Sequence, residues 1–341
     1  MVDDDVARLA IHELPCARGC TYVVPARDFA LALKVGEGFH DAELRTAYKL
    51  GVTAAEVDKL CDVVVAVLED GPLHPDELRK ATGNAARSLG EEGKKKGVTT
   101  TLPLALGRLQ ASGDIRRVPA NGRLDQQRYR YARWSPNPLS GFRLSLDEAY
   151  TELARLYFRW IGPATVNEFA GFAGMGAKAS KAAVAPLELE PLGPDDGRLL
   201  LPEDRAAFDQ FEIPDDPQFV LVSGLDGISL LRRDVLGLLT AENRTRCVPL
   251  EKGHGEVGTL QELPAHAILD RGSVVGLWLF DPETESVVAM PFVSESQALR
   301  DAIHGMEQFV RADLGDARSF SLDSPKSRAP MIQAMRKAIE S

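Results

Sequence analysis

Residues 115–134 read IRRVPANGRLDQQRYRYARW, and this stretch decides the fold. Its Asn121-Gly122 pair is the strongest short-range signal for a tight β-hairpin turn. The return segment, from Gln127 to Trp134, alternates arginine and tyrosine with a period of two, which is typical of a strand with one packed and one solvated face. We therefore expect an antiparallel hairpin with strands at 115–118 and 127–134.

Three helices are expected upstream of this hairpin. Thr53-Ala54-Ala55-Glu56 is a capping box that opens the first helix, and Gly71-Pro72 ends it. Pro75 opens a short second helix that stops near Gly83, and a third helix is expected over residues 102–112. Three helices followed by a hairpin are the layout of a winged helix, whose third helix can enter the major groove of DNA.

Positive charge is concentrated in this part of the chain. The whole sequence carries a net charge of −10, yet residues 79–133 contain thirteen Lys/Arg against four Asp/Glu. This segment is therefore +9 and the remainder is −19. Such segregation creates a local positive field that the overall charge conceals, and it favours a nucleic-acid partner.

We expect the hairpin and a lysine run to contact DNA phosphates. The run lies among Gly90, Gly93 and Gly97, which predicts a flexible loop suited to backbone contact rather than to base readout. The alternative is a solvated basic surface, and Tyr129 and Tyr131 are expected to pack on the core. The predicted DNA-binding residues are Lys94, Lys95, Lys96, Thr100, Thr101, Arg108, Arg116, Arg117, Arg123, Gln126, Gln127, Arg128 and Arg130.

The rest of the chain predicts further domains and an α+β class: tandem winged-helix units followed by a β-rich, partly closed C-terminal module. A second set of capping boxes and a hairpin at 145–202 lacks the positive charge, so we interpret it as structural. Strands are expected at 218–223, 266–269, 274–280 and 286–292. The expected domains are a partial first winged-helix unit with a connecting helix at 1–50, a basic winged helix at 51–136, a second complete winged helix at 139–213, and a β-rich module with two terminal helices at 214–341.

Composition and spacing exclude several functional classes. No apolar run reaches the ~20 residues that span a bilayer, and the acidic start is wrong for a signal peptide. The four cysteines form no C-x-x-C pair, and Pro15 interrupts the H-E-x-x-H pattern that His12-Glu13 begins. A glycine pattern at 253–258 leaves no room for a helix before Pro264. We expect a cytoplasmic protein with reduced thiols, no metal, no cofactor and no membrane partner.

Four stretches resemble one known family. Residues 18–28, RGCTYVVPARD, resemble the R-G-T-x-H-x-V-x-x-x-D stretch of AlkZ-like (YcaQ-type) winged-helix DNA glycosylases. Residues 79–134 are similar to the middle winged helix of that family, and 162–165 and 274–278 are similar to its later units. The resemblance implies a DNA-repair hydrolase that acts on damaged double-stranded DNA, removing alkylated bases or unhooking interstrand crosslinks.

The sequence also departs from the family pattern. Cys20 and Tyr22 stand where the family usually has Thr and His, and the catalytic Gln-x-Gln or Gln-x-Asp element, expected upstream of that stretch, does not occur. We therefore expect a chain without the N-terminal catalytic segment, and the catalytic residues stay unknown. Glu13 is a candidate general base, with a solvent-facing helix end as its alternative role. The alternative functions are a non-enzymatic winged-helix DNA-binding regulator and a scaffold that contacts protein.

Overall fold

The computed structural model describes residues 2–38, 40–124, 128–194, 196–232, 234–318 and 323–340. The chain divides into two compact units, one of Met1–Leu156 with Ala173–Leu187 and one of Tyr157–Phe172 with Glu188–Ser341. Helix α8 (Leu146–Ile161) contributes residues to both units. The mixture of helices and antiparallel strands confirms the α+β class. The expected division into four domains is finer than this division into two units, and it stays a prediction.

A short hairpin and three helices open the first unit. Strand β1 (Ile11–Pro15) pairs antiparallel with β2 (Thr21–Pro25). Alternate side chains of a strand point to one face, and on these two strands that face is buried, as Leu14 and Val24 show. The helices are α1 (Val2–Ala7), α2 (Phe29–Val35) and α3 (Asp41–Lys49).

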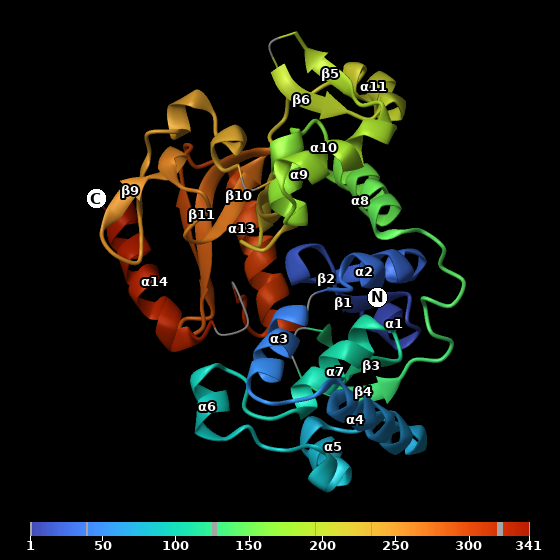
Figure 1. Ribbon diagram of the computed structural model, residues 1–341. Coiled ribbons are helices and arrows are strands. Elements are labelled where there is room, and N and C mark those ends of the chain that lie inside the picture. Colours follow the sequence, from blue (N-terminus) through green and yellow to red (C-terminus); the bar gives the residue numbers. More distant parts are fainter. Residues whose placement is uncertain are drawn as a thin grey trace. The chain divides into compact units, whose positions relative to one another are not determined.

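Four helices and a second hairpin complete most of the first unit (Figure 1). As predicted, Thr53 caps α4, and its hydroxyl accepts a hydrogen bond from the Glu56 N–H at 3.1 Å. The core beneath them is aliphatic and includes Val57, Leu60 and Ile115, all at most 1% exposed. The elements are α4 (Ala54–Val67), α5 (Pro75–Thr82), α6 (Gly90–Lys95), α7 (Leu102–Ala111), β3 (Ile115–Pro119) and β4 (Tyr129–Arg133), with α10 (Ala177–Val184) from the later segment.

The second unit begins with an aromatic cluster and a small hairpin. Tyr157 of α8 packs against Phe169 and Phe172 of α9 (Val166–Ala173), with ring centroids 5.6 and 5.0 Å away. Helix α9 begins at the predicted capping box, in which the Glu168 N–H donates to the Thr165 hydroxyl at 3.1 Å. The hairpin of β5 (Glu190–Gly193) and β6 (Asp196–Leu200) follows, and then α11 (Pro202–Asp209).

A four-stranded antiparallel sheet forms the rest of this unit, in the order β12-β11-β10-β7. Strand β11, one of the two inner strands, is buried along nearly its whole length, which explains its almost continuous apolar run. Helix α13 packs on one face and α14 on the other (Figure 1). Since β12 and β7 are edge strands, the sheet is open, and the expectation of a partly closed module is wrong. The bounds are β7 (Phe219–Val222), β10 (His266–Asp270), β11 (Ser273–Asp281), β12 (Ser286–Pro291), α13 (Gln297–Phe309) and α14 (Pro325–Glu340).

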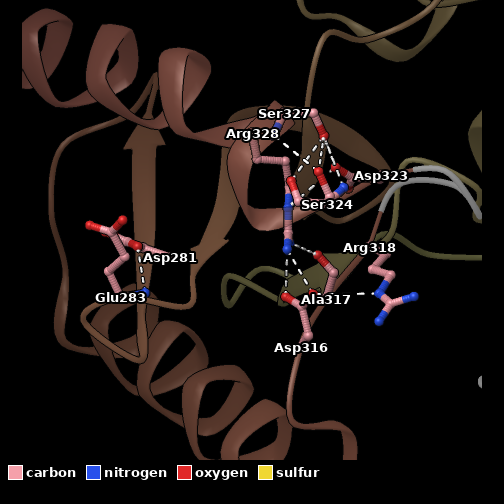
Figure 2. A network of polar contacts seen from close by, with 9 residues as sticks. All are labelled: Asp281, Glu283, Asp316, Ala317, Arg318, Asp323, Ser324, Ser327 and Arg328. Atoms are coloured by element: carbon pink, nitrogen blue, oxygen red, sulfur yellow. Dashed lines mark hydrogen bonds and ion pairs between the residues drawn. The ribbon is translucent and has the colours of Figure 1, made fainter.

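Helix α14 is anchored by a buried arginine. Figure 2 shows the Arg328 guanidinium between the 316–318 segment and the residues that open the helix. Its Nη2 donates to both carboxylate oxygens of Asp316 at 2.7 Å, and Nη1 donates to the Ala317 carbonyl. Asp323 lies 3.3 Å from the Arg328 Nε. Because Arg328 is only 5% exposed, these carboxylates compensate a charge that water cannot reach.

Two further local features complete the second unit. Ser296 caps α13, with its hydroxyl accepting from the Leu299 N–H at 3.2 Å. The glycine pattern at 253–258 overlaps a small hairpin of β8 (Cys247–Pro249) and β9 (His254–Glu256), and a single 3-10 turn, Val257–Thr259, follows it instead of the α-helix that a dinucleotide site needs. Among the described residues, no helix is long and apolar enough to cross a bilayer, and no group of three potential ligands gathers for a metal.

Candidate nucleic-acid interface

The predicted hairpin at 115–134 is present as β3 and β4. Its register pairs Ile115 with Arg133 and Pro119 with Tyr129. Gly122 has a φ of +78°, which a side chain would strain, so glycine is needed at this turn. Gln126 and Gln127, two of the predicted contacts, lie outside the described residues.

Five arginines on this hairpin have no carboxylate partner among the described residues. Arg128, Arg130 and Arg133 are exposed, whereas Arg116 and Arg117 are half-buried. Within the part of the chain that the structure describes, none of the five forms an ion pair with Asp or Glu. The hairpin therefore presents positive charge that the protein itself leaves uncompensated, as a phosphate-binding surface requires.

The helical cations of the same segment differ, because most of them are paired. Several of the acids responsible, Glu56, Asp58 and Asp76, precede the segment whose charge is +9, so the sequence count overstates the free charge. The pairs are Arg79–Asp76 at 3.2 Å, Arg87–Glu56 at 2.6 Å, Lys94–Glu91 at 2.6 Å, Lys95–Glu92 at 3.0 Å and Arg108–Asp58 at 2.5 Å.

The predicted lysine loop is a helix for most of its length. Lys94 and Lys95 form the last turn of α6, and Lys96 is its C-cap. Acids in the first turn and bases in the last turn both complement the helix dipole and pair at the i,i+3 spacing, which explains why a helix forms here. A new Cβ on Gly93 would lie 2.4 Å from the Val98 carbonyl, so this glycine permits close packing as well.

Thr101 is corrected from a contact residue to a core residue. It is 0% exposed, and its hydroxyl accepts a hydrogen bond from the Arg87 N–H at 3.1 Å. Thr100 is half-buried and bridges to Ser88. Both threonines hold the segment around α6 in place. Thr101 therefore offers no group to a phosphate.

Helix α7 does not present a surface for reading bases. Six of its ten residues are buried: Leu102, Leu104, Ala105, Leu106, Gly107 and Leu109. A Cβ on Gly107 would lie 2.6 Å from the His40 ring, so this part of the helix surface is also covered within the first unit. Arg108 is the exposed cation of α7, and it is paired with Asp58. The hairpin is therefore a better candidate for DNA contact than the third helix.

A polar contact joins the hairpin to β1. The phenol of Tyr129 donates a hydrogen bond to the Glu13 carboxylate, and the Arg117 guanidinium lies 4.8 Å from the centre of the Tyr129 ring. Burial, and then the Glu13 hydrogen bond and charge, raise the pKa of Tyr129 to about 12. At neutral pH the phenol is therefore a stable donor. Glu13 is half-buried on a strand, not at a helix end.

His12 lies beneath the same hairpin. Its ring makes edge contacts with Trp134 at 5.3 Å and Phe29 at 6.1 Å between centroids. Burial lowers its pKa to about 4, with additional repulsion from Arg116 and Arg117. The ring is therefore neutral at physiological pH and is an apolar support for the hairpin. The period-two pattern predicted the strand, but no sequence signal identified His12 and Glu13 as its neighbours.

The comparisons with known proteins agree with this architecture. The model of the AlkZ-like DNA glycosylase family matches residues 1–317. The fold is similar to that of the Streptomyces sahachiroi DNA glycosylase AlkZ, with a TM-score of 0.62 and 20% identity over 93% of this chain and 82% of that chain. No protein of curated function matches the sequence significantly. Because the family model spans most of its length, this chain belongs to the AlkZ-like DNA glycosylase family.

Proposed function

We propose that this protein binds double-stranded DNA, damaged DNA included, and that the β3–β4 hairpin is its main phosphate contact. Membership of a DNA glycosylase family supports DNA as the partner. The observation that carries the proposal is a contrast within the described residues: five hairpin arginines have no carboxylate partner there, whereas Lys94, Lys95 and Arg108 are paired. Attraction between cationic side chains and phosphates supplies most sequence-independent DNA affinity.

We rank the predicted contacts by their exposure and by their ion pairs. Arg128 and Arg130 are exposed and unpaired among the described residues, and Arg133 joins them as a further candidate. Arg116 and Arg117 are half-buried, and we expect them to add positive electrostatic potential to the hairpin surface. Arg117 also packs on the Tyr129 ring. Lys94, Lys95 and Arg108 can reach phosphate after releasing their carboxylate partners, so we assign them a smaller contribution.

The proposal separates DNA binding from base excision. Hydrolysis of an N-glycosidic bond needs a group that positions water and stabilises the developing sugar cation. The Gln-x-Gln or Gln-x-Asp element that the family resemblance associates with this role does not occur in the sequence. The carboxylate of Glu13 accepts a hydrogen bond from Tyr129, which competes with water for its lone pairs. We therefore propose that this chain recognises DNA without releasing alkylated bases.

A single-turnover experiment tests this separation. The chain is mixed in excess with a duplex that contains an N7-alkylguanine, and binding and base release are measured on the same samples. We expect a retarded complex and release at the background rate, since loss of general-base assistance typically costs ~10²–10⁴-fold. Release above background would overturn the proposed separation. Glu13→Gln would then show whether that carboxylate is responsible.

A further inference from the structure

Two cysteines face each other where the β1–β2 hairpin turns. The register of the hairpin pairs His12 with Val24, Leu14 with Tyr22 and Pro15 with Thr21. The next pair in this register is Cys16 and Cys20, and the Cys16 N–H donates to the Cys20 carbonyl at 2.9 Å. The Cys20 N–H donates to the Ala17 carbonyl at 3.0 Å, so the two cysteines share a single hydrogen bond just beyond the last assigned pair of the ladder.

The geometry of an antiparallel ladder brings both thiols to one face. Alternate residues of a strand share a face, and directly opposite residues share it across the pair. Cys16 and Cys20 thus continue the series of His12 with Val24 and Leu14 with Tyr22. Directly opposite residues of an antiparallel pair have Cα atoms about 4.5–5.5 Å apart. This separation lies within the roughly 4.4–6.8 Å that a disulfide spans.

The two thiols differ in access. Cys20 is exposed, whereas Cys16 is buried and burial raises its pKa to about 11. An oxidant in solution therefore meets Cys20 first, and Cys16 is placed to attack the oxidised sulfur from within the hairpin. The other cysteines lie elsewhere: Cys61 is buried in α4 with its thiol donating to the Ala105 carbonyl at 3.8 Å, and Cys247 belongs to the second unit.

We propose that Cys16 and Cys20 are a redox-sensitive pair that forms a reversible disulfide with low-molecular-weight disulfides such as oxidised glutathione. The Cys20 thiolate attacks one glutathione sulfur, the glutathione S–S bond breaks, and one reduced glutathione leaves. The Cys16 thiolate then attacks the Cys20 sulfur and expels the second glutathione as a thiolate, which takes up a proton. Two protein thiols are oxidised and one glutathione disulfide is reduced to two thiols.

The new bond would close the turn that contains Arg18. Arg18 has a φ of +55°, and its side chain hydrogen-bonds the Tyr22 hydroxyl. Glu13, which anchors Tyr129 of the basic hairpin, lies on the same β1 strand. Oxidation would therefore restrain the hairpin that supports the proposed DNA-binding arginines. The disulfide itself is independent of the proposed function.

Trypsin gives a direct readout, because Arg18 lies between the two cysteines. Cleavage after Arg8, Arg18 and Arg27 separates a peptide with Cys16 from a peptide with Cys20, so only a disulfide can hold the two together. The full-length chain is equilibrated in glutathione buffers, alkylated without reduction, digested and analysed by mass spectrometry. We expect peptides 9–18 and 19–27 to appear as a disulfide-linked pair that disappears after reduction. The amount of this pair should exceed that of any linked pair with Cys61 or Cys247 by roughly tenfold or more.

A matched control moves the second thiol by a single position. Cys20→Ser with Thr21→Cys keeps the number of thiols but turns the new one to the opposite face of the hairpin, because side chains alternate. This variant should give roughly tenfold less of the linked pair under the same buffers. The proposal is overturned by a lasting glutathione adduct on Cys20 without the linked pair, or by equal linkage in the control.

Discussion

The Tyr129 phenol donates a hydrogen bond to the Glu13 carboxylate, and this contact joins the basic β3–β4 hairpin to the β1–β2 hairpin. Arg117 lies over the same tyrosine ring at 4.8 Å. The aromatic ring therefore contacts one arginine, while its hydroxyl fixes the strand that carries Arg130 and Arg133. We infer that the position of the basic surface depends on residues that themselves need no contact with DNA.

Tyr129→Phe tests this connection. The variant keeps the ring beneath Arg117 but leaves the half-buried Glu13 carboxylate without its phenol donor. We expect the free energy of unfolding to fall by about 1.5 kcal/mol, the lower end of the range for hydrogen bonds to a charged group. Urea denaturation measures it. Tyr131→Phe is the control, since no hydrogen bond of its hydroxyl occurs among the described residues; equal losses in both variants would contradict the assignment.

His12 predicts a pH dependence of stability. Its folded-state pKa is lowered from 6.5 to about 4, so between these values the unfolded chain binds a proton that the folded chain does not. The contribution to stability is complete above pH 6.5 and is lost as the pH falls towards 4, by up to about 3 kcal/mol. Denaturation at a series of pH values should show a shallower slope for His12→Phe over this window. Parallel curves for His12→Phe and the parent would refute the assignment.

Arg328 should contribute strongly to the stability of the second unit. Arg328→Ala leaves Asp316 and the buried Asp323 without their compensating charge, and we expect a loss of about 3 kcal/mol. Arg318→Ala removes an exposed arginine that lies 3.5 Å from the same Asp316, and it should cost less than about 1 kcal/mol. Thermal or urea unfolding compares the two. Similar losses would mean that the burial of Arg328 has no energetic consequence.

Local signals predicted much of the fold. The capping boxes at Ser145 and Thr165 form as expected, because such a box needs only residues three positions apart. At Thr53 only the hydroxyl half of the box forms, since the Glu56 carboxylate pairs with Arg87 instead. The two strands of the 115–134 hairpin and the four strands of the C-terminal sheet also agree with the prediction. The tight turn expected at Asn121-Gly122 is wrong, because the last strand pair is Pro119 with Tyr129 and the connection runs over residues 120–128. These elements are specified by turn chemistry and by alternation over short distances.

Tertiary contacts explain what the sequence could not reveal. The pairing of Arg108 with Asp58 joins α7 to α4, so a count of charges along one segment could not detect it. Thr101 is polar and follows a basic run, yet its hydroxyl is used by the Arg87 N–H within the core. The Glu13–Tyr129 contact likewise joins positions far apart in the chain.

The hairpin arginines should supply more of the DNA affinity than the lysines of α6. Fluorescence anisotropy with a labelled duplex, at several salt concentrations, compares the parent chain with two variants that each lose three positive charges. One is Arg128→Ala/Arg130→Ala/Arg133→Ala on the hairpin, and the other is Lys94→Ala/Lys95→Ala/Lys96→Ala at α6. Equal changes in net charge make each variant the control for the other.

We expect the affinity of the parent chain to fall steeply with salt, since each phosphate contact adds about 0.9 to the slope of log K against log salt concentration. The hairpin variant should lose about 2–3 units of that slope and at least roughly tenfold in affinity at moderate salt. The α6 variant should lose about one unit, because Lys94 and Lys95 are already paired with Glu91 and Glu92. A flat salt dependence of the parent, or equal losses in the two variants, would contradict the assignment of the hairpin as the DNA-binding surface.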